Sequence, residues 1–267
     1  MLMKILMCPP DHYGIEYEIN PWMKLENKSD RERALAQWNK LYQTIHACGA
    51  EISLIPPVNG CPDMTFTANA GLLYQNKIIL SHFKYPQREV EAAHFEKWFK
   101  QAGFQVLNPV SEHEHSPFFE GAGDALTDGE FVYVGFGFRS DLSFYTQTSF
   151  FDQEKLVMCE LVDPYFYHID TCFCPLDKNL AIWYPNAFSA ESQTLMQSKT
   201  HLIAVNEEEA KRFACNAVVI DKHVITPTGC PNLTNDLKAL GYTVFACEMD
   251  EYLKAGGACK CLTLRLD

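Results

Sequence analysis

The chain has 267 residues, of which 47% are hydrophobic and 21% are charged, so it can bury a sizeable core and is not disordered throughout. Its formal net charge of -12 disfavours nucleic acids and anionic membranes as partners, because both are negatively charged. No stretch reaches the roughly 18 apolar residues that span a bilayer. We expect one domain over residues 1–267, since no linker or low-complexity segment divides the chain.

The eleven cysteines indicate the compartment of the protein. They are odd in number and lie between Cys8 and Cys261, without the dense spacing of small secreted scaffolds. The apolar run at the N-terminus ends at Pro9-Pro10, too early for a signal peptide. Cys172 and Cys174 lack a second Cys/His pair at zinc spacing, so no structural metal site is predicted. We therefore expect a cytoplasmic protein with reduced thiols.

Three helices are expected from apolar spacing and end signals. After a strand at Lys4–Met7, a first helix is predicted from Asp30 to Ala47, ended by Gly49. A second is predicted from Arg88 to Ala102, ended by Gly103. A third opens at Asn206, an N-cap residue followed by acidic residues, and runs through Phe213.

Four β-hairpins are expected between the helical stretches. Each consists of two short apolar runs around a polar turn with Asn, Asp or Gly, residues that tolerate positive φ. They cover residues 72–80, 125–134, 174–183 and 218–226, and recur about every 50 residues, a period typical of repeat arrays and propellers. We predict an α/β fold of about five such units. The terminal strands Lys4–Met7 and Cys261–Leu266 would complete the fifth unit and close a ring.

The C-terminal segment joins a glycine pair to two thiols. Gly256 and Gly257 let the backbone approach a ligand closely, and a thiolate is a strong nucleophile near neutral pH. Cys261 is expected to begin the closing strand. Cys259 lies two residues earlier and would face the same way on a strand, so either thiol fits this argument.

Polar residues stand at equivalent places, just before the predicted hairpins. They are Asn69 before the first, Glu120 and Asp124 before the second, and His168 and Asp170 before the third. Repeats arranged about an axis would bring these positions together, and a buried charge needs partners. His168 and Asp170 are two residues apart, so on a strand both side chains would lie on the same face. A thiol, an imidazole and several carboxylates predict nucleophilic catalysis on a cationic substrate.

Four motifs resemble the guanidine-modifying superfamily of arginine deiminases, dimethylarginine dimethylaminohydrolases and amidinotransferases. They are Phe66–Asn69, Phe119–Asp124, His168–Asp170 and the terminal Gly-Gly…Cys-Leu-Thr. The resemblance covers the whole chain and implies a five-bladed α/β propeller of the pentein type. Residues 7–13 and 19–23 look closest to the arginine dihydrolase domain of cyanobacteria. Those longer proteins carry a further C-terminal domain, whose activity is not carried over.

The resemblance also implies roles for single residues. Cys261, which is followed by Leu262-Thr263, matches the nucleophile. His168 matches the general acid/base, and Glu120 matches the acid that orients the histidine. The positions that match substrate-binding groups are Asp170 and Asn69 for the guanidinium, Arg88 and Arg139 for the α-carboxylate, Asn20 for the amino-acid end, and the neighbouring carboxylate Asp124. No cofactor and no metal are implied. The expected partner is a small-molecule substrate, and a homo-oligomer stays open.

Asn69 separates activities within the superfamily, because deiminases typically have an aspartate there. An amide both donates and accepts hydrogen bonds, so it can also hold the neutral ureido group of citrulline. We expect an arginine dihydrolase that forms ornithine, ammonia and carbon dioxide through a covalent cysteine intermediate. A deiminase that stops at citrulline, a dimethylarginine dimethylaminohydrolase and an amidinotransferase remain alternatives. A ribosome anti-association factor with the same propeller is disfavoured by the thiol, the imidazole and the acidic charge.

Overall fold

Fifteen short strands form five three-stranded sheets in the computed structural model of the protein, which describes residues 2–109 and 116–267. The sheets, in pairing order, are β15 (Leu264–Arg265), β1 (Lys4–Met7) and β2 (Glu51–Leu54); β3 (Gly71–Tyr74), β4 (Lys77–Leu80) and β5 (Gln105–Leu107); β6 (Ala125–Thr127), β7 (Val132–Phe136) and β8 (Leu156–Glu160); β9 (Phe173–Asp177), β10 (Leu180–Trp183) and β11 (His201–Ala204); and β12 (Val218–Ile220), β13 (His223–Pro227) and β14 (Thr243–Cys247).

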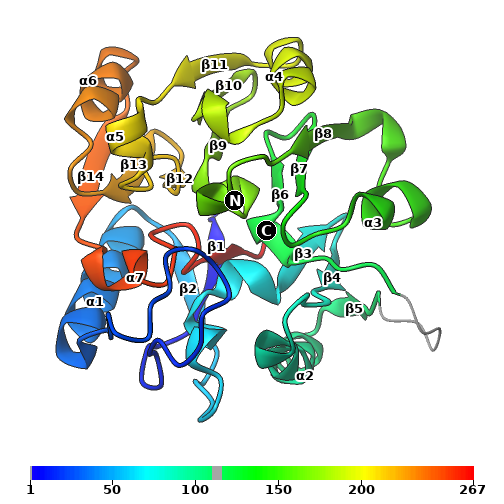
Figure 1. The fold of residues 1–267 in the computed structure, drawn as a ribbon, viewed down its shortest axis with the longest axis vertical. Helices are drawn as coiled ribbons and strands as arrows, with labels where there is room; N and C mark the ends of the chain where they lie inside the picture. The colour runs from blue at the N-terminus through cyan, green and yellow to red at the C-terminus, as the bar shows by residue number, and fades with distance from the viewer. Residues whose placement is uncertain (1, 110–115) are drawn as a thin grey trace.

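Every sheet has the same topology. The middle strand is antiparallel to one neighbour and parallel to the other; the antiparallel pair is a hairpin in four sheets, and in the fifth it joins β1 to β15. A parallel pair needs a crossover, and here each crossover contains a helix. These helices are α1 (Arg31–Ala47), α2 (Pro86–Gln101), α3 (Leu142–Gln147), α4 (Ala190–Gln197) and α6 (Pro231–Ala239). The sheets follow one another in chain order around a centre, with these helices on the outside (Figure 1). The predicted five-unit α/β propeller is confirmed.

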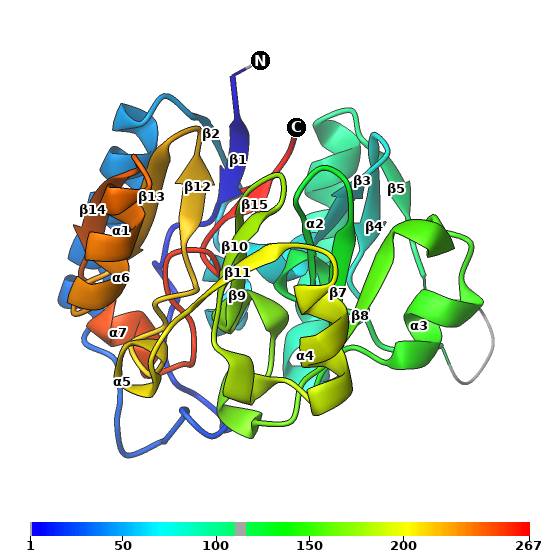
Figure 2. The ribbon, with the colours of Figure 1, turned by 90° about the horizontal axis from the view of Figure 1, so that it is seen from above.

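The two ends of the chain close the ring, as expected. Strand β1 pairs with β15 in an antiparallel register that places Ile5 opposite Arg265. Both ends lie on the same side of the molecule (Figure 2). The prediction that Cys261 begins the closing strand is wrong, because β15 covers only Leu264–Arg265 and Cys261 lies in the preceding turn.

The predicted hairpins are confirmed and the predicted helices largely so. The Asp30 side chain caps α1 by accepting from Arg33 N, and Gly49 follows the helix with a φ of 96°. Asn206 caps α5 (Glu207–Ala210), which ends earlier than expected. The prediction did not include α3, α4, α6 or α7 (Asp250–Leu253).

Short 3-10 segments lead into several of the hairpins. The 3-10 segments are Pro62–Thr65, Thr67–Ala70, Gly121–Gly123, Gln153–Lys155, Pro164–Phe166, Ile169–Thr171 and Pro185–Ala187. His168 precedes one of them and Asp170 lies inside it, so the expectation that both lie on one face of a strand is wrong. The tighter 3-10 backbone sends their side chains to different partners in the site.

Candidate active site

One small cavity brings together residues from distant parts of the chain. It has a volume of about 10 Å³, room for roughly one water molecule. Six of the nine residues singled out in the sequence line it: Asn20, Asn69, Arg88, Arg139, His168 and Cys261. Glu120, Asp124 and Asp170 are buried beside it and touch its lining residues, as the following contacts show. Cys261 and His168 thus share a single site.

Glu120 lies at the centre of a buried ion network. Its Oε2 is 2.9 Å from His168 Nε2 and accepts from Arg139 Nη1 at 2.9 Å, while Oε1 accepts from Lys84 N at 3.2 Å. Burial alone would raise the pKa of Glu120, but Arg139 and then His168 outweigh it and hold the pKa well below its usual value. Glu120 is therefore ionised at neutral pH and fixes the His168 ring. Among the described residues, the other ring nitrogen, Nδ1, has no hydrogen-bond partner.

Asp124 lies behind the histidine rather than on the cavity wall. Its Oδ2 accepts from Ser140 Oγ at 2.6 Å and lies 4.0 Å from His168 Nε2. Its Oδ1 accepts from Ile169 N at 3.3 Å. Burial raises the pKa of Asp124 to about 6, although His168 and Ser140 act against it. Asp124 therefore contacts the segment that carries His168, and its assignment to substrate binding stays a prediction.

Cys261 lies between a carboxylate and an amide. Its Sγ is 3.4 Å from Asp170 Oδ2 and accepts from Asn216 Nδ2 at 3.0 Å. Burial and then Asp170 raise the pKa of the Cys261 thiol well above its usual value, and Asn216 and Lys260 lower it by less. Burial also raises the pKa of Asp170 to about 6, against the opposing charge of Lys260. The raised pKa therefore favours the thiol as the form of Cys261 at neutral pH.

The two candidate cysteines occupy different environments. Cys261 lines the cavity, whereas Cys259 is completely buried and does not. Burial raises the pKa of Cys259 well above its usual value, with Cys247 and Cys230 as neighbours. Because both residues lie in a turn, the argument that strand neighbours face the same way does not apply.

The two arginines on the cavity wall already hold carboxylates. Arg88 binds Glu91 through Nε at 3.1 Å and Nη2 at 2.9 Å, and it donates from Nη1 to Asn69 Oδ1 at 2.8 Å. Arg139 donates to Glu120, and its guanidinium stacks between Tyr85 and Tyr167 at 4.7 and 4.6 Å. A guanidinium has five N–H donors, so each arginine keeps at least one for a ligand.

Asn20 and the glycine pair shape the mouth of the cavity. Asn20 donates from Nδ2 to Ala255 O at 3.0 Å and accepts at Oδ1 from Trp22 N at 2.9 Å, so it joins two loops. A β-carbon at Gly256, whose φ is 82°, would lie 2.8 Å from the Tyr167 hydroxyl. One at Gly257 would lie 2.8 Å from the Phe66 ring. The two glycines therefore let the backbone lie close to the side chains of Tyr167 and Phe66. The sequence had suggested that the backbone approaches a ligand here.

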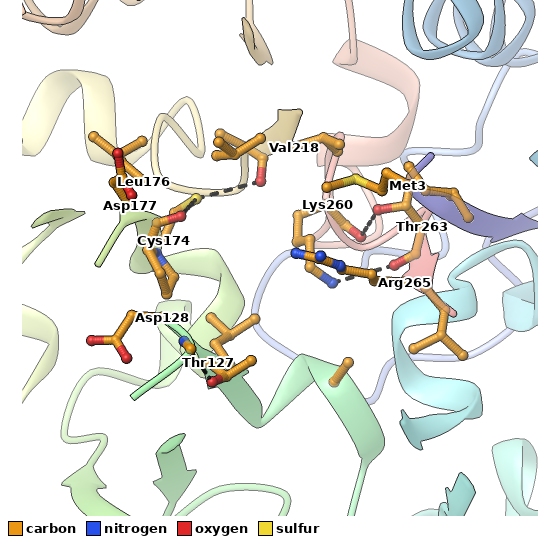
Figure 3. A pocket seen from close by; sticks show the side chains of 18 of the residues that line it. Met3, Thr127, Asp128, Cys174, Leu176, Asp177, Val218, Lys260, Thr263 and Arg265 are labelled. Atoms are coloured by element: carbon orange, nitrogen blue, oxygen red, sulfur yellow. Dashed lines mark hydrogen bonds between the residues drawn. The ribbon is translucent and has the colours of Figure 1, made fainter. Parts of the chain in front are cut away.

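A second cavity of about 730 Å³ lies on the hairpin side of the sheets and contains Lys260 (Figure 3). Its wall includes residues from several first strands, such as Leu126, Phe173 and Val218. Lys260 Nζ donates to Thr263 O at 3.3 Å, next to the thiol turn. The cavity is larger than the first but contains neither the candidate nucleophile nor the histidine. No group of three or more His, Cys, Asp or Glu within residues 2–109 and 116–267 is placed to hold a metal ion.

Two residues of the site were not predicted from the sequence. Asn216 contacts the Cys261 sulfur, and it stands just before the fourth hairpin, the place where the other repeats carry polar residues. Asp63 lines the cavity, is 2% exposed and accepts from the Tyr17 hydroxyl at 2.9 Å with Oδ2. Its Oδ1 has no partner among the described residues. The repeat position could have indicated Asn216, whereas no local pattern marks Asp63.

The family follows from comparison with known proteins. A family model described as "N,N dimethylarginine dimethylhydrolase, eukaryotic" matches residues 15–266. The chain belongs to the dimethylarginine dimethylaminohydrolase family. A family member from Mycobacterium tuberculosis, an N(G),N(G)-dimethylarginine dimethylaminohydrolase, is 34% identical over 97% of this chain and 84% of its own length.

The chain is also similar to cyanobacterial proteins. The bifunctional arginine dihydrolase/ornithine cyclodeaminase ArgZ of Synechocystis sp. is 43% identical over 99% of this chain. The chain spans 38% of the length of that relative. A crystal structure of an N-terminal domain variant of ArgZ, covalently bonded to a reaction intermediate, superposes with a TM-score of 0.91 at 42% identity, covering 99% of this chain and 98% of that one.

In the described part of our chain, no helix has the length and apolar character needed to cross a membrane.

Proposed function

We propose that this protein is a cysteine hydrolase of the arginine guanidinium group, an arginine dihydrolase that forms ornithine, ammonia and carbon dioxide. The observation that carries the proposal is the shared cavity of Cys261 and His168, with Glu120 and Asp170 buried directly behind them. A thiol next to an imidazole and carboxylates is suited to attack the carbon of a planar cation. The similarity to ArgZ supports arginine as the substrate.

The walls of the cavity offer partners to each end of arginine. Asp170 and the amide of Asn69 would hold the guanidinium. The N–H donors of Arg88 and Arg139 that are not already used would hold the α-carboxylate. The unpartnered Oδ1 of Asp63 would accept from the α-ammonium. Arginine is far larger than the present volume of about 10 Å³, so binding requires lining residues to move. The loops joined by Asn20 are the candidates.

The first round converts arginine to citrulline. The cationic guanidinium stabilises a thiolate at Cys261, whose pKa is otherwise raised by burial. His168 accepts the proton of the Cys261 thiol, the sulfur bonds to the guanidinium carbon, and His168 passes that proton to one nitrogen, which leaves as ammonia. Water, deprotonated by His168, then adds to the carbon of the thiouronium intermediate. The carbon–sulfur bond breaks, which releases citrulline and the free thiol.

The second round uses citrulline. The thiolate attacks the ureido carbon and a second ammonia leaves, giving an S-alkylthiocarbamate. Water releases the sulfur and leaves a carbamate on the δ-nitrogen, which decomposes to ornithine and carbon dioxide. Two waters enter and two ammonia molecules and one carbon dioxide leave, so the atoms balance. Asn69 supports this round, because its Nδ2 donates to Glu120 O at 3.0 Å and keeps a second N–H for the ureido oxygen.

A dimethylarginine dimethylaminohydrolase is the second candidate, favoured by the family model that matches residues 15–266. It would use the same thiol and histidine but release dimethylamine. We also propose that residues 1–267 form one domain in a reducing cytoplasm. The continuous ring of sheets supports the first statement, and eleven free cysteines support the second.

The deciding experiment is incubation of the purified protein with arginine labelled at the guanidinium carbon. We expect ornithine and labelled carbon dioxide, with two ammonia molecules for each ornithine. Cys261→Ala should abolish turnover, and Cys259→Ala, which removes a thiol outside the cavity, is the matched control. Citrulline as the final product would favour a deiminase, and turnover of dimethylarginine alone would favour the second candidate. Full activity in Cys261→Ala would overturn the mechanism.

A further inference from the structure

Asn216 makes an unusually complete set of contacts around the candidate nucleophile. It is 0% exposed and precedes β12. Its Oδ1 accepts from the backbone N–H groups of Ala258, Lys260 and Cys261 at 3.1, 3.0 and 3.2 Å. Its Nδ2 donates to Asp170 O at 2.9 Å and to Cys261 Sγ at 3.0 Å. One carboxamide therefore binds the whole turn that carries the thiol and connects it to the segment that carries Asp170.

We propose that Asn216 is the positioning residue of the nucleophile, which fixes the 258–261 turn with its oxygen and stabilises the Cys261 thiolate with its nitrogen. The side chain has one acceptor and two N–H donors, and all of them are used. A hydrogen bond to the charged form of a group favours that form. The inference rests on the proposed function only for the identity of the nucleophile.

The surroundings of the sulfur explain why such a donor is needed. Burial and the Asp170 carboxylate both oppose ionisation of Cys261, while Asn216, the Ala258 N–H and the charge of Lys260 favour it. The other titratable groups nearby are Tyr167, Cys259 and, on the same cavity, Asp63, His168, Arg88 and Arg139. The amide thus supplies a fixed donor without adding a charge beside the cationic substrate.

The two functions of the amide can be separated by Asn216→Asp. The new carboxylate keeps the shape and an oxygen acceptor for the three backbone N–H groups, which also keep it ionised. It has no N–H for Cys261 Sγ or Asp170 O and it brings a negative charge next to the sulfur, so the turn is retained while both changes disfavour the thiolate. Asn216→Ala removes both functions. Asn186→Asp, at an exposed asparagine, introduces the same charge away from the site and is the matched control.

The readout is the pH dependence of Cys261 alkylation by iodoacetamide, followed on the Cys261 peptide by mass spectrometry. We expect Asn216→Asp to raise the apparent pKa of Cys261 by at least one unit, equivalent to a tenfold smaller thiolate fraction at neutral pH. Hydrogen exchange at the Ala258 and Cys261 amides should stay protected in Asn216→Asp and become fast in Asn216→Ala. The Lys260 amide is left out of this comparison, because it also donates to the backbone oxygen of residue 216, at 3.2 Å. Asn186→Asp should match the unmodified protein in both measurements.

An unchanged alkylation pKa in Asn216→Asp would overturn the proposal, as would continued protection of the Ala258 and Cys261 amides in Asn216→Ala. Asn216→Ser, whose hydroxyl is too short to span both partners, adds no charge and is measured alongside; a rise of the Cys261 pKa in this variant reports the lost donor alone, and no rise would contradict the role of the amide nitrogen. Alkylation needs no substrate, so the experiment is independent of the proposed function. A protein inactive on arginine that still shows the shift would refute the function and retain the role of Asn216.

Discussion

Under the proposed function, Asn69→Asp should stop the reaction at citrulline. In the structure, Asn69 accepts from Arg88 Nη1 at 2.8 Å and donates to Glu120 O at 3.0 Å, and its side chain lines the cavity. An aspartate keeps the contact with Arg88 but loses both N–H donors. Cationic arginine is still attracted by the new carboxylate, whereas the neutral ureido oxygen of citrulline meets no donor.

The size of the effect follows from the lost hydrogen bond. A buried group left without its partner costs about 1–3 kcal/mol, which corresponds to roughly a 5- to 150-fold lower rate for the second round. The first round should change by much less, because its substrate is charged. The substitution also places an oxygen against Glu120 O, so we expect a loss of about 1–3 kcal/mol in the free energy of unfolding.

The assay follows citrulline and ornithine over time by amino-acid analysis, starting from arginine and, separately, from citrulline. Citrulline should accumulate with Asn69→Asp and be consumed slowly when supplied alone. Asn186→Asp, an exposed site, controls for added charge. An unchanged ratio of ornithine to citrulline would refute the role assigned to the amide.

Three further predictions concern the charges around the site. Arg139→Ala leaves Glu120 buried without its main partner, so the free energy of unfolding, measured with urea, should fall by about 3–5 kcal/mol. A fall of less than about 1 kcal/mol would contradict the importance of this ion pair. The pKa of Asp170 is raised to about 6 from an unfolded value of about 3.9, so its contribution to stability is present below pH 3.9 and is lost as the pH rises through 6. Asp170→Asn should therefore reduce the fall in the free energy of unfolding between pH 4.5 and 6.5 by about 2 kcal/mol. An unchanged fall would show that Asp170 does not titrate in this range. Lys260→Met removes a charge that lowers the pKa of Cys261, so the pH profile of Cys261 alkylation should move upward, and a downward move would contradict this role.

The parts of the fold that could be predicted are those with local signals. The hairpin turns at Asn76, Asn179 and Asp221 have positive φ, the property for which their residue types were singled out. Helices α1 and α2 have 17 and 16 residues, long enough to show a clear apolar period. Helices α3 and α4 have only 6 and 8 residues, so the period has too few turns to be recognised.

Most residues that line or adjoin the cavity could be predicted from the sequence, but Asn216 and Asp63 were missed and the geometry was not predicted. The repeat brings the polar residues before the hairpins to one place, which requires only the period and the closure of the ring. The pairing of Arg88 with Glu91 and of Arg139 with Glu120 depends on side-chain packing between elements, which no local pattern specifies. The backbone before the third hairpin is a 3-10 turn rather than a strand, so the reasoning from strand faces failed for His168 and Asp170.

The repeat also explains why asparagine recurs in this site. Asn69 stands two residues before β3, and Asn216 stands two residues before β12. Each amide reaches the backbone of a neighbouring repeat, Asn69 at Glu120 O and Asn216 at Asp170 O. In the second repeat the same position is Gly123, where a β-carbon would collide with the Asn69 amide. At this pair of neighbouring positions, the side chain of Asn69 therefore requires a residue without a β-carbon at position 123.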